Sequence, residues 1–125
     1  MNDIENEEDL YRYNKVQDKV YAQVLNELRN GKKRTHWMWF IFPQIIGLGK
    51  SSMAKFYSIK NKEEAVLYLN DPILRERLEE CTNILLGCEG KTALQIFGFT
   101  DEKKLKSSMT LFASISNPNS IFHQV

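Results

Sequence analysis

HWMWFIFPQIIGLGKSSMAKFYSI, residues 36–59, is the stretch around which the rest of the chain can be interpreted, because part of it occurs twice. The decapeptide KSSMAKFYSI at 50–59 returns as KSSMTLFASI at 106–115, and seven of the ten positions are identical. A repeated polar run indicates a repeated structural unit, since an apolar period alone recurs in any helical protein. We therefore expect two related units within this chain.

The size and charge of the chain predict one ordinary globular domain. It has 125 residues, of which 42% are hydrophobic and 26% charged, and its formal net charge is +1. One core can be built from a chain of this length, whereas two cannot. A nearly neutral balance disfavours nucleic acid as a partner, because no global positive field would attract it. Charge is uneven locally, with five acids and no base in residues 1–10 and a basic cluster in residues 29–34.

Cysteine spacing and hydropathy predict a soluble cytoplasmic protein without a membrane partner. Cys81 and Cys88 fall in a helical pattern, where seven residues span about 10 Å, too far for a disulfide. They are therefore expected to be small core residues of a reduced protein. The chain opens without a signal peptide and contains no apolar run of membrane-spanning length.

Helical periodicity is strongest near the start of the chain. Apolar residues recur at helical spacing over residues 10–28, and Asn30 and Gly31 follow as an expected end of that helix. The preceding residues 1–9 are expected to form an acidic flexible N-terminus, which leaves 10–125 as the single helical domain.

Capping signals predict two more helices in the middle of the chain. Asn61 with Glu64 three positions later fits a capping box for a helix through Leu69. Asp71 followed by Pro72 is typical of a helix start, here of a helix that continues to about residue 86.

The remaining segments predict short helices joined by a glycine loop. Residues 36–42 and 91–98 are each expected to form a short buried helix, and residues 43–49 form a loop. Ser51 or Ser52 is expected to cap the next helical turn, and Thr100 to cap a turn through residue 105. No segment alternates like a strand, so the fold class is all-α, with about six or seven helices in two pseudo-repeated units, residues 10–59 and 62–115.

The motifs HWMWFIFPQ, GLGKSSM and KSSMTLF together resemble an uncharacterised bacterial family that is often mislabelled calpastatin. The resemblance runs from about Leu10 to Phe122. It implies an all-helical fold likened to armadillo-type stacking, and it implies no settled activity. Members of that family continue past Phe122 with another helical turn, whereas this sequence stops at Val125, so the last helix is expected to pack incompletely.

The two KSSM segments suggest an anion-binding site. A serine that caps a helix beside a lysine offers a hydroxyl, free backbone N–H groups and a positive charge. Gly47 and Gly49 add a resemblance to a phosphate-cradling loop, although the spacing of a true P-loop is absent. The competing interpretation is that each serine only caps its own helix and that the flanking apolar residues are core. The candidate anion-binding residues are Lys50, Ser51, Ser52, Lys106, Ser107 and Ser108.

The aromatic run supplies the other candidate ligand-binding residues. Trp37 and Trp39 could line a cleft and stack on a base. Gln44, close by in the sequence, could bind the base or the sugar. His36 is the one candidate for a catalytic acid or base. The competing interpretation is a buried aromatic core with one satisfied histidine.

Three functions follow from these patterns. The leading hypothesis is binding of an anionic, nucleotide-like small molecule in a cleft between the two units. The alternatives are a helical protein–protein interaction module without a ligand, and an enzyme that acts on a nucleotide derivative through His36. No cofactor or metal site is expected, because the two histidines and two cysteines lack ligand spacing. The carboxylates of Glu63, Glu64, Glu79 and Glu80 are expected to lie on solvated helix faces.

Overall fold

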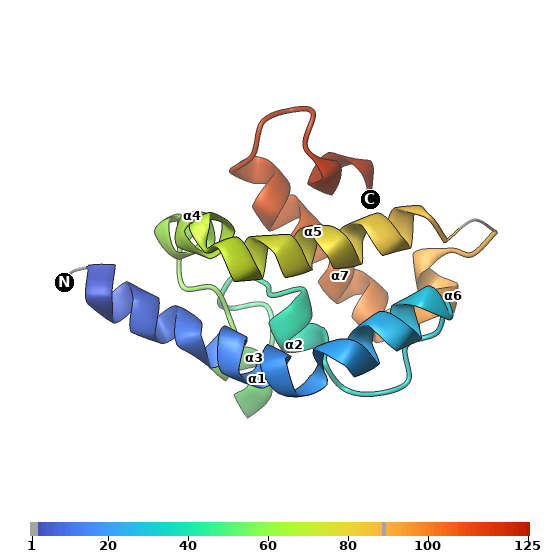
Figure 1. Cartoon of the computed structure of the whole chain (residues 1–125), viewed down its shortest axis with the longest axis horizontal. Helices are drawn as coiled ribbons and strands as arrows, with labels where there is room; N and C mark the ends of the chain where they lie inside the picture. Colours follow the sequence, from blue (N-terminus) through green and yellow to red (C-terminus); the bar gives the residue numbers. More distant parts are fainter. Residues whose placement is uncertain (1–2, 89) are drawn as a thin grey trace.

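A computed structural model describes residues 3–88 and 90–125, with side chains from Leu10 onward, and over these residues the protein is helical (Figure 1). The predicted all-α class with six or seven helices is confirmed, whereas the structure does not show the predicted internal repeat. Backbone pairing of β type is limited, in this part of the chain, to one parallel bridge between Ile45 and Ile59. The elements in order are α1 (Asp3–Arg29), α2 (Met38–Ile41), α3 (Ser52–Phe56), α4 (Lys62–Asn70), α5 (Pro72–Leu86), α6 (Ala93–Phe97), α7 (Phe99–Ser114) and the 3-10 turn η1 (Ile121–Gln124).

The long helices α1 and α5 pack against each other, and the short helix α2 contacts both α1 and another long helix, α7 (Figure 1). After α7 the chain turns back, and η1 packs against α7 and α5. The core therefore draws side chains from both halves of the sequence. Over the described residues, no helix combines the length and the apolar character that a membrane crossing requires.

Helix α1 begins earlier than its apolar pattern predicts. It starts at Asp3, and it ends at Arg29, just before the predicted stop at Asn30 and Gly31. Tyr13 is fully buried, so the predicted apolar stripe does face the core. Flexibility of residues 1–9 stays a prediction, and residues 1 and 2 lie outside the described part of the chain.

Helices α4 and α5 start where their capping signals predict. The Asn61 carboxamide oxygen accepts a hydrogen bond from the Glu64 N–H at 2.8 Å, and the Glu64 carboxylate accepts one from the Lys60 N–H at 2.9 Å. The Asp71 carboxylate accepts hydrogen bonds from the first free N–H groups of α5, and Pro72 occupies the first turn. Local capping therefore defines both helix starts.

Glu64 corrects one expectation, since its side chain is buried and not part of a solvated helix face. Its carboxylate lies 3.4 Å from the guanidinium of Arg12. Arg12 also donates hydrogen bonds to the carbonyl oxygens of Phe56 at 2.8 Å and Ser58 at 2.9 Å. One guanidinium thus joins α1 to the end of α3 and the start of α4, which uses the planar fork of donors that arginine provides.

The second KSSM segment has a different structure from the first. Helix α7 runs without interruption and starts directly after Gly98, so Thr100 and Ser107 lie inside it and begin no helical turn. The expectation that both are caps is therefore wrong. The physical reason lies just upstream: Gly47 and Gly49 precede the first copy, whereas the helix-forming residues 102–105 precede the second.

Candidate functional site

The first KSSM segment is a helix start on the surface. The Ser51 hydroxyl oxygen accepts a hydrogen bond from the Ala54 N–H at 3.1 Å, so Ser51 is the cap that the sequence predicts, and Lys50 and Ser52 are exposed. Gly47 has a left-handed backbone with φ of +99°. A Cβ on Gly49 would lie 2.4 Å from the Cβ of Ala54, so the loop passes α3 too closely for any side chain. Both glycines therefore have local structural roles.

The serines of the second KSSM segment offer no helix N-terminus to a ligand. Ser107 donates its hydroxyl to the Lys103 carbonyl at 3.1 Å within α7. Ser108 is fully buried, and its hydroxyl has no hydrogen-bond partner among the residues that the structure describes. Lys106 lines a cavity of about 700 Å³ with His123, and residues 50–52 do not line that cavity. The two segments are thus not brought together around this cavity.

The predicted aromatic site divides into a buried part and a surface part. Trp37 is buried, and its ring packs edge-on against Phe97 with centroids 6.1 Å apart. Trp39 is half-buried and its ring centroid lies 6.4 Å from that of the exposed His36. The main-chain carbonyl oxygen of Gln44 accepts a hydrogen bond from the Ile59 N–H at 2.8 Å. His36 and Trp39 therefore lie close together at the surface, whereas Trp37 lies in the core.

Glu27 explains why Trp37 points inward, although the sequence pattern did not single out this residue. One carboxylate oxygen accepts hydrogen bonds from the Trp37 indole at 2.9 Å and from the Arg34 N–H at 2.7 Å. The other accepts the Thr35 hydroxyl at 2.6 Å and the Gln23 amide at 2.8 Å. Burial acts to raise the pKa of Glu27, but hydrogen bonds led by those of Thr35 and Arg34 outweigh it and lower the pKa to about 2. Glu27 therefore holds the loop before α2 in place.

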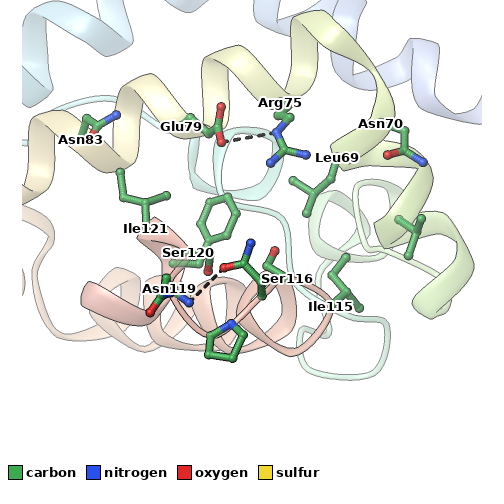
Figure 2. Close-up of a pocket in the computed structure, with 14 residues that line it drawn as sticks. Leu69, Asn70, Arg75, Glu79, Asn83, Ile115, Ser116, Asn119, Ser120 and Ile121 are labelled. Atoms are coloured by element: carbon green, nitrogen blue, oxygen red, sulfur yellow. Dashed lines mark hydrogen bonds and ion pairs between the residues drawn. The ribbon is translucent and has the colours of Figure 1, made fainter.

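A cavity larger than the one beside Lys106 lies elsewhere, between α4, α5 and the segment after α7 (Figure 2). Its volume is about 810 Å³, within the range of roughly 300–1,000 Å³ that small-molecule pockets occupy. Its lining residues are Val66, Leu69, Asn70, Arg75, Glu79, Asn83, Ile115, Ser116, Asn117, Pro118, Asn119, Ser120, Ile121 and Phe122. We refer to it as the α4–α5 cavity.

One wall of the α4–α5 cavity is a polar stripe of α5. Arg75, Glu79 and Asn83 are spaced four residues apart, so they lie on one face of the helix. The Arg75 guanidinium and the Glu79 carboxylate form an ion pair at 3.3 Å, drawn in Figure 2. Because these two are the charged residues of the lining, the cavity has no net formal charge. Glu79, predicted to be a solvated carboxylate, is thus a half-exposed cavity residue.

The opposite wall comes from the segment that follows α7. The Asn117 side-chain oxygen accepts the Asn119 N–H at 3.0 Å, which forms a tight turn around Pro118 (Figure 2). The Ser120 hydroxyl is buried and has no hydrogen-bond partner within the described part of the chain. Phe122 is buried and packs on Phe112 with ring centroids 5.9 Å apart, so the end of the described chain is anchored to α7.

Hydrogen-bonding capacity in the α4–α5 cavity exceeds what the protein itself uses. The carboxamide groups of Asn70, Asn83 and Asn119 make no hydrogen bond to the rest of the described chain. Each carboxamide offers two N–H donors and one acceptor oxygen. The buried Ser120 oxygen has almost no surface that a ligand could reach, so these carboxamides are the groups available for binding. The arrangement can therefore bind hydroxyl or amide groups of a ligand from several sides.

Sequence patterns contain only a weak signal for this cavity. The spacing of Arg75, Glu79 and Asn83 is equally typical of a solvated helix face, and residues 117–120 are equally typical of a surface turn. Their convergence depends on the return of the chain after α7. A useful hint is the density of asparagine and serine over residues 116–120.

Comparisons with known proteins give a family and a solved relative. A family model described as protein of unknown function (DUF1810) matches residues 7–125. The crystal structure of the conserved hypothetical protein Rv1873 from Mycobacterium tuberculosis is similar to this chain, with a TM-score of 0.89 and 48% sequence identity. The alignment covers 91% of this chain and 81% of that one. No curated protein matches the chain.

Proposed function

We propose that this chain, which belongs to the DUF1810 family of unknown function, binds a small molecule in the α4–α5 cavity. The proposed ligand is uncharged, rich in hydroxyl groups and of nucleoside size. One observation carries this proposal: carboxamide groups of α4, α5 and the turn after α7 line a single volume of about 810 Å³. This keeps the nucleotide-like character that the sequence suggests and changes both the place of the site and the charge of the ligand.

The charge of the ligand follows from the ion pair in the wall. A phosphate needs an excess of positive charge or several free backbone donors. Arg75 is already paired with Glu79 at 3.3 Å, so it offers no uncompensated charge. A nucleoside or a similar polyhydroxylated molecule suits this neutral wall better than a nucleotide.

The contacts expected of such a ligand follow from the chemistry of the lining. A carboxamide forms paired hydrogen bonds with the edge of a nucleobase, a role that Asn83 or Asn70 can take. The asparagine carboxamides of the 116–120 turn can bind ribose hydroxyls, and Leu69 and Ile121 offer apolar surface to the base. The lining contains no histidine or cysteine, so binding is proposed without turnover. Catalysis by His36, which lies outside this lining, stays a prediction.

The proposal is tested by thermal-shift and calorimetric titration with adenosine, guanosine, cytidine, uridine and free ribose. We expect at least one nucleoside to raise the melting temperature and to bind more tightly than ribose. Asn83→Ala should weaken that binding by about 3- to 10-fold, because one hydrogen bond to a neutral ligand is lost.

A matched control for this experiment is Asn26→Ala, since Asn26 is an exposed helical asparagine outside the cavity. It should leave nucleoside binding unchanged. Absence of a shift with all five compounds, or equal weakening by both substitutions, would refute the proposal.

A further inference from the structure

We propose a second, independent site that takes a small aromatic phosphate, in the groove between α1 and the end of α3. This groove encloses about 280 Å³ and is lined by Arg12, Lys15, Val16, Lys19, Phe56 and Tyr57. Three of these six residues are cations and none is an acid. The groove is therefore positively charged, in contrast to the neutral α4–α5 cavity.

The guanidinium of Arg12 holds the two sides of the groove together, and its positive charge is already paired with Glu64. It donates to the carbonyl oxygens of Phe56 and Ser58 and lies 3.4 Å from the buried Glu64 carboxylate. These contacts hold the end of α3 against α1, so the groove is formed in advance of any ligand. Preformed geometry lowers the entropic cost of binding.

Lys15 and Lys19 supply the uncompensated positive charge. They lie one turn apart on α1, both exposed, and neither forms an ion pair or hydrogen bond with the described part of the chain. The neighbouring acid Asp18 is engaged elsewhere, since it pairs with Arg77 at 2.6 Å. Like charges at this spacing repel each other on a helix, and an anion between them removes that repulsion.

Phe56 supplies an aromatic surface beside these lysines. Its side chain is 58% exposed, which is unusual for a phenylalanine. The ring meets the Tyr57 ring edge-on with centroids 4.8 Å apart, and the Tyr57 ring in turn packs on Phe40 at 5.3 Å. Phe56 is thus backed by the aromatic core, and it can stack with the ring of a ligand.

Size and charge together select the ligand class. A volume of about 280 Å³ accommodates one ring with one phosphate and is too small for a dinucleotide. The phosphate would lie between Lys15 and Lys19, and the ring against Phe56. This chemistry occurs in a free aromatic phosphate and in one unit of a single-stranded nucleic acid, and we commit to the free small molecule.

The test measures the contributions of the phosphate and of the aromatic ring to binding separately. The full chain is titrated calorimetrically with phenyl phosphate, with inorganic phosphate and with benzyl alcohol. Phenyl phosphate should bind at least about 10-fold more tightly than either of the others, because stacking and ion pairing act together. The double substitution Lys15→Ala with Lys19→Ala should reduce its affinity to that of benzyl alcohol. Phe56→Leu should reduce it to that of inorganic phosphate.

The chain contains a matched control at the start of α7. Lys103 lies over the ring of the exposed Phe99, with its ammonium 4.3 Å from the ring centroid, yet neither residue lines the groove. Lys103→Ala and Phe99→Leu should leave phenyl phosphate binding unchanged. Equal weakening by these controls, or phenyl phosphate that binds no better than inorganic phosphate, would overturn the proposal. So would a single-stranded oligothymidylate that binds while phenyl phosphate does not.

Discussion

At the scale of single residues, Glu27 shows how a buried charge can be stabilised without a cation. Its side chain is 2% exposed, and both carboxylate oxygens accept hydrogen bonds from N–H or O–H donors. Hydrogen bonds to an ionised group are the strong ones, and they offset the cost of burial. The loop that carries Arg34 and Thr35 therefore depends on the ionised form of one carboxylate.

A pH dependence follows from the lowered pKa of Glu27. The folded pKa of about 2 lies below the ordinary value of 4.5, so the ionised carboxylate stabilises the fold fully above pH 4.5. This contribution, on the order of 3 kcal/mol, is lost as the pH falls from about 4.5 to about 2. Urea unfolding at a series of pH values checks it in comparison with Glu27→Gln, in which the titrating group is absent. If the stability difference between the two proteins stayed constant from pH 6 to pH 2.5, Glu27 would not be the group responsible.

At the scale of elements, the two copies of the sequence KSSM have different structural roles, one at the start of α3 and the other inside α7. In the first copy Ser51 accepts a hydrogen bond from the Ala54 N–H and begins a helix. In the second, Ser107 lies inside a helix and donates to the carbonyl of Lys103. A serine favours helix starts because its side chain replaces a missing backbone partner, and in a helix interior it has no such advantage over alanine.

Matched alanine substitutions test this difference. Ser51→Ala should destabilise the protein by about 1 kcal/mol, because a cap is lost. Ser107→Ala should be neutral or stabilise it by up to about 0.5 kcal/mol, because alanine is the better residue inside a helix. Both values can be measured by urea unfolding followed by circular dichroism. Equal losses at the two positions would mean that the copies are structurally equivalent after all.

The individual helices were largely predictable, for local reasons. The starts of α4 and α5 were confirmed at Asn61 and Asp71, because each cap bonds to N–H groups two or three residues away. The start of α7 was missed, because Thr100 looks like a cap and only the chain geometry after Gly98 places it inside the helix. A cap residue is necessary for many helix starts but does not by itself determine one.

At the scale of the whole molecule, residues from both predicted units share one core. Tyr68 of α4 packs edge-on against Tyr13 of α1 with ring centroids 5.1 Å apart. Its ring also packs in a tilted arrangement on Phe112 of α7, with centroids 5.3 Å apart. Gln17 of α1 donates to the Phe40 carbonyl at 2.7 Å and to the Tyr68 hydroxyl at 3.2 Å. Contacts of this kind make the two halves interdependent.

We therefore expect the protein to unfold in one cooperative transition. Both tryptophans, Trp37 and Trp39, lie in the first half, so their fluorescence reports that half, whereas far-ultraviolet circular dichroism reports all helices. Leu78→Ala in α5 should lower both midpoints equally and cost about 2–5 kcal/mol, because a buried leucine is removed. A fluorescence midpoint that does not move while the dichroism midpoint falls would show two independent units.

The sequence alone was enough to predict the helical class, the helices α1, α4 and α5, and the caps at Asn61 and Asp71, because these depend on periodicity and on groups within about four residues. Tertiary structure decided that Trp37 faces Glu27, that Ser108 is buried, and that Asn70, Asn83 and Asn119 line one cavity. The convergence of side chains from different elements on one cavity, such as Asn83 of α5 and Asn119 after α7, depends on how the helices pack. Helical periodicity specifies which face of a helix is apolar and leaves open which distant segment covers it.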